Sequence, residues 1–181
     1  LDRLKSGDTL VLAGSIPNTL PDDMYERIME HLSGRGIRIV VDATKNLLRR
    51  VLKYRPFLIK PNNHELGEMF GVVLKTDDEI VAHAKKLQEE GAENVLISMA
   101  GDGAILLTRE GVFYRSAAPK GTLVNSVGAG DSMVAGFLAG FMESDGDYAR
   151  AFYMGVATGS ASAFSENLAT RDEALALLKI L

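Results

Sequence analysis

The chain has 181 residues, of which 46% are hydrophobic and 24% charged, as is typical of a soluble globular protein with one sizeable core. Its formal net charge of -4 argues against nucleic acid or an anionic membrane as the main partner, so we expect small soluble ligands. It has no cysteine, which excludes disulfides and thiolate metal sites, and no apolar run long enough to cross a bilayer. We therefore expect a cytoplasmic protein that folds as a single α/β domain over residues 1–181.

Strands alternate with helices over the first half of the chain. The expected elements, in chain order, are strand 9–12, helix 22–32, strand 37–41, strand 57–59, helix 63–70 and strand 95–98. Thr76 and Glu79 form a capping box for one further helix, which carries Ile80, Ala84 and Leu87. Such alternation implies right-handed crossovers and a parallel sheet covered by helices.

The pattern changes in the second half of the chain. Residues 104–108 and 112–114 predict a β-hairpin with a glycine in its turn. Two helices rich in small residues follow at 129–142 and 148–163, and their composition is suited to close packing. Thr170 and Glu173 form the capping box of a last helix.

The most informative segment is 125–132, where a glycine-rich turn leads into an apolar helix. The first backbone N–H groups of a helix lack intrahelical partners, and Gly128 and Gly130 let an anion approach them closely. Asp131 would repel that anion unless its carboxylate acts as a base for a group that attacks it, which suggests phosphoryl transfer. A tight loop followed by an acidic helical turn explains the same residues without any chemistry.

Polar side chains follow several of the expected strands. Asp42, Lys60 with Asn62, and Ser98 stand at strand ends, and ligands of open parallel sheets bind at that edge. Asn62 and Glu65 are spaced to face one cleft and could hold a hydrated Mg²⁺. Each residue also has a structural explanation, namely a helix cap for Asp42 or Asn62, a surface charge for Lys60 and a turn residue for Ser98.

Four segments together resemble the PfkB branch of the ribokinase-like sugar kinases. NSVGAGDSMVAGFLAG at 125–140 resembles the second signature of that family, and 60–65 matches its Lys-Pro-Asn and Asn-x-x-Glu units. The segments 14–17 and 98–103 match its Gly-Ser-Leu-Pro-like element and its serine-led glycine loop. Within the family the chain is most similar to the phosphosugar kinases, the 1-phosphofructokinases and tagatose-6-phosphate kinases.

The resemblance implies a ribokinase-like α/β fold, a three-layer parallel sheet with helices on both faces. It also implies ATP and Mg²⁺ as cofactors and a sugar phosphate as substrate. Asp131 matches the catalytic base, and the amides of Gly128, Ala129 and Gly130 match the anion hole for the transferring phosphoryl group. The implied reaction converts fructose 1-phosphate to fructose 1,6-bisphosphate, and a non-catalytic nucleotide- or metabolite-binding module is the alternative.

The family's other functional positions can be matched one by one. Those that contact or line the ATP site correspond to Lys60, Asn62, Ser98, Gly101, Gly103, Leu123, Val156 and Ser160. Ser15 corresponds to a contact with the substrate's phosphate, and Glu65 to the residue that organises Mg²⁺. A loop for a monovalent cation such as K⁺ corresponds to Asn125, Val127, Ser162, Ser165 and Asn167.

The chain also departs from the family pattern. Ala100 and Asn167 stand where relatives commonly have glycine, and asparagine tolerates a left-handed turn better than most residues. The resemblance covers only the C-terminal, nucleotide-binding part of the family, so the fold is expected to lack the first strands and the lid. We expect the 181 residues alone to have little kinase activity, and an uncovered sheet edge to favour association, including homo-oligomers.

Overall fold

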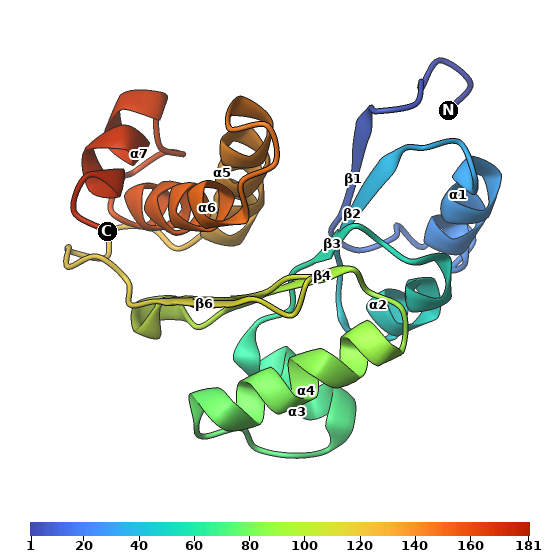
Figure 1. Ribbon diagram of the computed structural model, residues 1–181, viewed down its shortest axis with the longest axis horizontal. Coiled ribbons are helices and arrows are strands. Elements are labelled where there is room, and N and C mark those ends of the chain that lie inside the picture. Colours follow the sequence, from blue (N-terminus) through green and yellow to red (C-terminus); the bar gives the residue numbers. More distant parts are fainter. The chain divides into compact units, whose positions relative to one another are not determined.

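Figure 1 shows the computed structural model, which describes residues 1–181 except for the side chain of Lys45. The chain divides into two compact units. The first comprises Leu1–Ile97 with Leu107–Val112, and the second comprises Ser98–Leu106 with Phe113–Leu181. That the two units behave as a single domain stays a prediction.

The first unit alternates strands with helices. Its elements are β1 (Thr9–Ala13), α1 (Met24–Leu32), β2 (Arg38–Asp42), α2 (Lys45–Val51), a 3-10 helix (Leu52–Tyr54), β3 (Leu58–Ile59), α3 (Asn63–Phe70), α4 (Asp77–Glu89) and β4 (Asn94–Ser98). The strand order is β1-β2-β3-β4, and all three pairs are parallel. The α/β alternation expected from the sequence is confirmed.

The helices of this unit cover one face of its four strands. In Figure 1, α1 and α2 (blue to teal) and α3 and α4 (green) lie on the same side of β1–β4. Right-handed crossovers between strands that follow one another in the sheet produce this arrangement. The centre of the core is formed by Val40, Val41, Leu58, Ile59 and Leu66, which are fully buried.

Capping boxes fix where two of these helices begin. The Asn62 side chain accepts the Glu65 N–H while the Glu65 carboxylate accepts the Asn62 N–H, and Thr76 and Glu79 do the same for α4. The helix α2 was not expected from the sequence, because it is short and its cap residue Thr44 makes no side-chain hydrogen bond. Local signals therefore place α3 and α4, while α2 depends on packing through Leu48.

A buried asparagine links two strands of the first unit. Asn94 is fully buried; its Nδ2 donates to the Phe57 carbonyl at 2.6 Å, and its Oδ1 accepts the Arg109 N–H at 3.0 Å. Because a buried amide is costly to leave unpaired, these bonds hold the N-terminal ends of β3 and β4 in register.

The second unit contains a β-hairpin and three helices. Its elements are β5 (Ala104–Leu107), β6 (Phe113–Ser116), α5 (Ala129–Glu143), α6 (Tyr148–Ala163) and α7 (Arg171–Leu178), with a 3-10 helix at Ala100–Asp102. In the strand order β6 lies next to β5, and α6 contacts α5, α7 and β6. A capping box of Thr170 and Glu173 starts α7, as the sequence predicts.

The helices α5 and α6 approach each other through glycines. A Cβ at Gly140, Gly155 or Gly159 would lie 2.9 to 3.0 Å from a carbonyl oxygen of the facing helix, and a Cβ at Gly136 would collide with Thr158. The two backbones are therefore in direct contact, which confirms the close packing expected from the small residues.

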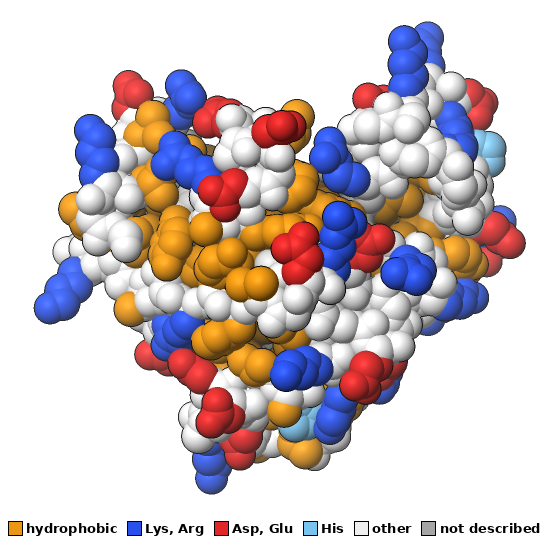
Figure 2. Space-filling view, in the orientation of Figure 1, with side chains coloured by type: hydrophobic (Ala, Val, Ile, Leu, Met, Phe, Trp, Pro, Cys, Tyr) orange, Lys and Arg blue, Asp and Glu red, His pale blue; other side chains and the backbone are white. Residues whose placement is uncertain are grey.

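The surface carries charges of both signs. On the face that Figure 2 shows, acidic and basic side chains are interspersed, with hydrophobic side chains between them. Among the described residues, no helix has the length and apolar character needed to cross a membrane.

Candidate functional site

The predicted site residues fall into two groups, one in each unit. In the first unit, the parallel register places the residues after β1, β2 and β3 at one edge of the sheet. Ala13 pairs with Asp42 and Val41 pairs with Ile59, so Asp42 and Lys60 come to lie side by side. The positions of the strand ends in the sequence had already predicted that these polar residues lie at the same edge of the sheet.

Lys60 forms an ion pair with Asp42 at this edge. Lys60 Nζ lies 3.2 Å from Asp42 Oδ1, and the two side chains are only 9% and 17% exposed. The alternative explanation of Lys60 as an exposed surface charge is therefore wrong. The ion pair holds the ammonium group at this edge, where its remaining N–H groups can donate to a phosphate.

Tyr25 on α1 belongs to the same edge and was missed in the sequence. Its hydroxyl donates to the carbonyls of Ala13 and Gly14, at 2.8 and 3.2 Å. The pKa of Tyr25 is raised, mainly by burial and to a smaller extent by the negative charge of Asp42. The hydroxyl is therefore a hydrogen-bond donor. Tyr25 and Ala13 are 12 positions apart in the sequence, and no local residue pattern reveals a contact over that separation.

Asn62 and Glu65 are the N-cap and third residue of α3. Asn62 Oδ1 accepts the Glu65 N–H at 2.8 Å, and Glu65 Oε2 accepts the Asn62 N–H at 2.9 Å. The helix-cap explanation of Asn62 is thus confirmed. Only Oε2 of Glu65 is engaged among the contacts of the described residues, so a role of Glu65 toward Mg²⁺ stays a prediction.

Ser15 lies in the exposed loop that follows β1. The loop is tied to the edge by the Gly14 N–H, which donates to the Asp42 carbonyl at 2.9 Å. Ser15 is therefore accessible to a ligand at the end of the sheet.

In the second unit, the turn before α5 is held by Asn125. Its Oδ1 accepts the Val127 N–H at 3.0 Å, and its Nδ2 donates to the Glu166 carbonyl at 3.2 Å. The Asn125 N–H also donates to the Ala163 carbonyl at 3.1 Å. The turn is thereby joined to the C-terminal end of α6 and to the segment after it.

The helix α5 begins without a side-chain cap. Gly128 is its N-cap residue, with a φ of 78° that only glycine adopts at little cost, and no side chain bonds to the first-turn amides. The Ala129 N–H donates to the Ser126 carbonyl at 3.2 Å, at the long end of the range for such bonds. This helix terminus can therefore receive an anion.

Asp131 stands in the first turn of α5 and is exposed. Its carboxylate has no hydrogen-bond or ion-pair partner among the described residues. The next residue, Ser132, is buried and begins the helical ladder, since its N–H donates to the Gly128 carbonyl at 2.8 Å. An unpaired carboxylate thus lies in a helical turn whose amides receive no side-chain cap, and its catalytic role stays a prediction.

The loop after β4 forms a closed turn. The Met99 N–H donates to the Gly103 carbonyl at 2.8 Å, and Arg115 Nη1 donates to the Asp102 carbonyl at 2.9 Å. Ala100, where the family pattern commonly has glycine, adopts a left-handed φ of 48°, which strains a residue that carries a Cβ. Ser98 is the last residue of β4, Gly101 lies in the 3-10 helix Ala100–Asp102, and Gly103 follows that helix.

Three residues matched to the adenine pocket have different environments. Leu123 is 67% exposed, Val156 is fully buried within α6, and Ser160 is half-buried. Because Val156 has no exposed surface, it does not line an open cavity in this conformation. The adenine-lining role of these residues stays a prediction.

The residues matched to a monovalent-cation loop surround the end of α6. Asn125 and Val127 share the turn described above, and Ser165 and Asn167 follow α6. Asn167 has no left-handed backbone, so the turn does not depend on the tolerance of asparagine for that region. Among the described residues, no three His, Asp or Glu side chains gather as a metal cluster.

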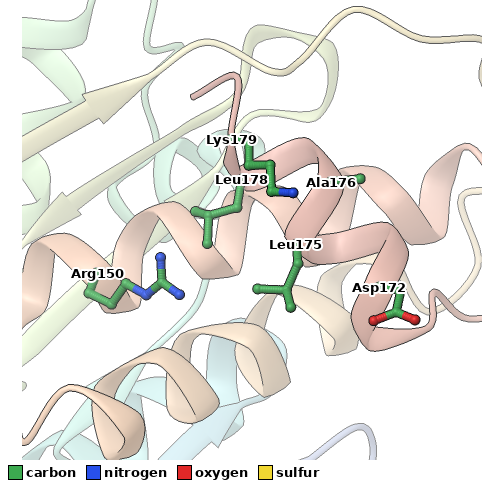
Figure 3. Close-up of a pocket in the computed structure, with 6 residues that line it drawn as sticks. All are labelled: Arg150, Asp172, Leu175, Ala176, Leu178 and Lys179. Atoms are coloured by element: carbon green, nitrogen blue, oxygen red, sulfur yellow. The ribbon is translucent and has the colours of Figure 1, made fainter.

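Two surface pockets lie away from these groups. A cavity of about 510 Å³ in the second unit is lined by Arg150 of α6 and by residues of α7 and its C-terminal end (Figure 3). Another of about 360 Å³ in the first unit is lined by Arg55, Arg109 and the end of α4. None of the predicted site residues lines either cavity.

Comparison with known proteins identifies relatives over nearly the whole chain. The model of the pfkB family of carbohydrate kinases matches residues 1–174. A 1-phosphofructokinase of Bacillus subtilis (strain 168) is 53% identical over 169 residues, which are 93% of this chain and 55% of that protein. A D-tagatose-1-phosphate kinase of Bacillus licheniformis is 37% identical over 92% of this chain and 54% of its own length.

Solved structures show the same fold. A Staphylococcus aureus protein described as a phosphofructokinase superposes with a TM-score of 0.92 at 39% identity, over 98% of this chain and 57% of its own. Phosphofructokinase-2 of Escherichia coli in complex with fructose-6-phosphate gives 0.88 at 26% identity, over 98% and 57%. A ribokinase of Arabidopsis thaliana gives 0.79 at 20% identity over 94% and 55%, which supports the fold alone.

The expected ribokinase-like fold class is therefore confirmed. The chain spans about half the length of the curated relatives it matches. The family model covers the segments that carried the resemblance, including the turn of Gly128 and Asp131. The chain belongs to the pfkB family of carbohydrate kinases.

Proposed function

We propose that the chain is the nucleotide-binding and catalytic part of an ATP-dependent kinase that phosphorylates a sugar phosphate. One observation carries this proposal. At the start of α5, first-turn amides without a side-chain cap lie beside the exposed, unpaired carboxylate of Asp131. A module that only binds a phosphate gains nothing from a carboxylate there, whereas a transferase needs both groups.

In the proposed reaction Asp131 acts as the general base. The acceptor hydroxyl gives its proton to the Asp131 carboxylate while its oxygen forms a bond to the γ-phosphorus of ATP. The bond from that phosphorus to the bridging oxygen breaks, and ADP leaves with the electron pair. Asp131 suits this role because its carboxylate is exposed and has no competing partner among the described residues.

The amides of Gly128, Ala129 and Gly130 would stabilise the charge on the transferring phosphoryl group. Preorganised donors of this kind contribute on the order of 100- to 1000-fold in rate. An anion must compete with the Ser126 carbonyl for the Ala129 N–H, but that bond is long at 3.2 Å. The other first-turn amides receive no bond from a capping side chain.

Further ATP contacts are proposed for the first unit. Lys60, through its remaining N–H groups, and Asn62 would bind phosphate groups, and Glu65 would hold Mg²⁺ through water. Bound Mg²⁺ would neutralise charge on the phosphates. The free Oε1 of Glu65 is the oxygen suited to this task, since Oε2 caps α3. For the second unit, the proposed nucleotide contacts are Ser98, Gly101, Gly103, Leu123, Val156 and Ser160.

Fructose 1-phosphate is the acceptor we propose, with fructose 1,6-bisphosphate as product. The 53% identity to a 1-phosphofructokinase supports this choice, and the exposed Ser15 would contact the sugar's phosphate. Tagatose 1-phosphate is the competing acceptor, given the 37% identity to a kinase named for it.

A monovalent cation and self-association are further parts of the proposal. A potassium complex of E. coli phosphofructokinase-2 has a TM-score of 0.88 at 26% identity, and a tetrameric form of that enzyme has 0.87 at 26%. These likenesses support K⁺ at the loop of Asn125, Val127, Ser162, Ser165 and Asn167. They also support a homo-oligomeric whole protein.

The test is the Asp131→Asn substitution in the full-length protein. We expect kcat to fall by at least about 100-fold in a coupled ADP-release assay with fructose 1-phosphate, because the base is removed. ATP affinity, measured by calorimetry, should change little, since asparagine leaves the first-turn amides in place.

The matched control is Asp172→Asn, in the first turn of α7. It should keep turnover, since this carboxylate has no role in the proposed reaction. Full turnover in Asp131→Asn would exclude Asp131 as the base. Nucleotide binding without any sugar phosphorylation by the wild-type protein would favour the binding-module alternative.

A further inference from the structure

A buried pair of serine hydroxyls lies directly behind the proposed catalytic turn. Ser132 follows Asp131 but points inward, and Ser132 and Ser162 are only 7% and 2% exposed. Ser162 Oγ donates to Ser132 Oγ at 2.8 Å and accepts the Ala169 N–H at 2.9 Å. One buried chain of hydrogen bonds thus joins the first turn of α5, the last turn of α6 and the segment before α7.

Tight packing of α5 against α6 does not by itself require these hydroxyls. The glycine contacts already bring the two backbones together, and a Cβ at Gly159 would lie 3.0 Å from the Ala129 carbonyl. Burying hydroxyls costs desolvation, and apolar groups of the same shape often stabilise a protein equally well. A directional bond adds something that packing lacks, namely a fixed rotation of one helix end against the other.

The first turn of α5 has few other anchors of its own. Gly128, Ala129 and Gly130 carry no side chain long enough to fix the turn, and no cap side chain bonds to it. Ser132 starts the helical ladder through its bond to the Gly128 carbonyl at 2.8 Å. Since residue directions differ by about 100° along a helix, anchoring Ser132 inward directs Asp131 outward.

We propose that Ser132 and Ser162 are positioning residues that hold the first turn of α5 in the orientation needed for phosphoryl transfer. This inference rests on the proposed function of Asp131. The two serines touch neither ATP nor sugar. Apart from the place of Ser162 in the proposed K⁺ loop, they act through the direction of the Asp131 carboxylate and of the amides beside it. A small rotation of this turn would displace both groups together.

The experiment compares Ser132→Ala, Ser162→Ala and the double variant in the full-length protein. We expect kcat to fall about tenfold in each single variant, with KM for ATP within about threefold of wild type, because orientation and not binding is lost. The double variant should be no slower than the slower single variant, because both substitutions break the same bond between Ser132 and Ser162.

The matched control is Ser144→Ala, at the other end of α5. Ser144 Oγ donates to the Gly140 carbonyl at 2.7 Å, so its loss removes a hydroxyl bond from the same helix. This variant should lower the melting temperature but keep kcat. A kcat for Ser132→Ala within about twofold of wild type, or an equal loss in Ser144→Ala, would overturn the inference.

Amide hydrogen exchange separates this inference from the proposed function. The amides of Ala129 and Ser132, which donate to the carbonyls of Ser126 and Gly128, should exchange faster in Ser132→Ala and Ser162→Ala but not in Ser144→Ala, whether or not the protein turns over sugar. Unchanged exchange rules out the positioning contact. If the wild-type protein shows no ATP-dependent phosphorylation, the proposed function is overturned, and so is the catalytic purpose of the serines. Faster exchange in the variants would still show that the two serines anchor the first turn of α5.

Discussion

Lys60 and Asp42 depend on each other at the level of single residues. The ammonium and carboxylate lie 3.2 Å apart, and the lysine side chain is almost completely buried. Removing one member of such a pair leaves a desolvated charge without compensation, which costs more than the intact pair contributes. The pair therefore ties the stability of the sheet edge to the positive charge proposed to bind phosphate.

We expect Asp42→Asn to lower the free energy of unfolding by about 2 kcal/mol. This loss is smaller than the cost of breaking a fully buried pair, because the Asp42 carboxylate keeps some access to water. Urea denaturation measures this loss. The control is Asp22→Asn, whose carboxylate pairs with Arg50 at 3.2 Å but is 90% exposed. It should cost less than about 0.5 kcal/mol, and equal losses in the two variants would contradict the prediction.

At the scale of elements, helix starts were predicted best. Asn62, Thr76 and Thr170 each form a capping box with the glutamate three residues later, so the starts of α3, α4 and α7 were visible locally. In α4 this bonding couples helix stability to pH, because the ionised Glu79 carboxylate accepts the N–H groups of Lys75 and Thr76.

Glu79 provides a direct test of this coupling. Backbone N–H groups of Lys75 and Thr76, in that order of effect, hold the pKa of Glu79 below its ordinary value. A lowered pKa in the folded state means that the stabilisation is present above the unfolded pKa and is lost as pH falls through the folded one. The stability difference between wild type and Glu79→Gln should therefore shrink below about pH 4. A difference that stays constant from neutral pH to about pH 3 would show that ionisation is irrelevant.

Other parts of the fold and site could not be predicted from local sequence. Helix α2 has no cap bond, and it forms because Leu48 and Val51 are buried. The contact of Tyr25 with the loop after β1 and the bond between Ser132 and Ser162 join residues distant in the chain, so no spacing reveals them. By contrast, Gly128 and Asp131 could be proposed from the sequence, because an anion site at a helix start depends on consecutive residues.

At the scale of the whole molecule, the chain matches only part of its relatives. It covers 55% of the B. subtilis 1-phosphofructokinase and 57% of the S. aureus structure. From the family resemblance we expect the lid, and with it part of the sugar contacts, to belong to the part not matched. Phosphoryl transfer by these 181 residues alone would then proceed without exclusion of water and with few sugar contacts.

We expect the isolated 181-residue chain to have a kcat/KM for fructose 1-phosphate at least about 100-fold below that of the full-length protein. A coupled ADP-release assay on both proteins, at equal concentration, measures the ratio. Circular dichroism of the short chain serves as the control, because an unfolded chain would be inactive for a trivial reason. Rates within about tenfold of each other would show that the matched part is sufficient for catalysis.

The glycine contacts between α5 and α6 have a mechanical consequence. Side chains at an interface can change rotamer and let one helix slide over another, but backbones in contact leave no such freedom. A Cβ has no room at Gly136, Gly140, Gly155 or Gly159, so the two helices form a stiff block. If Asp131 is the base we propose, a sliding motion of α5 toward the acceptor would carry α6 with it, so that a pair of helices and not a loop would move.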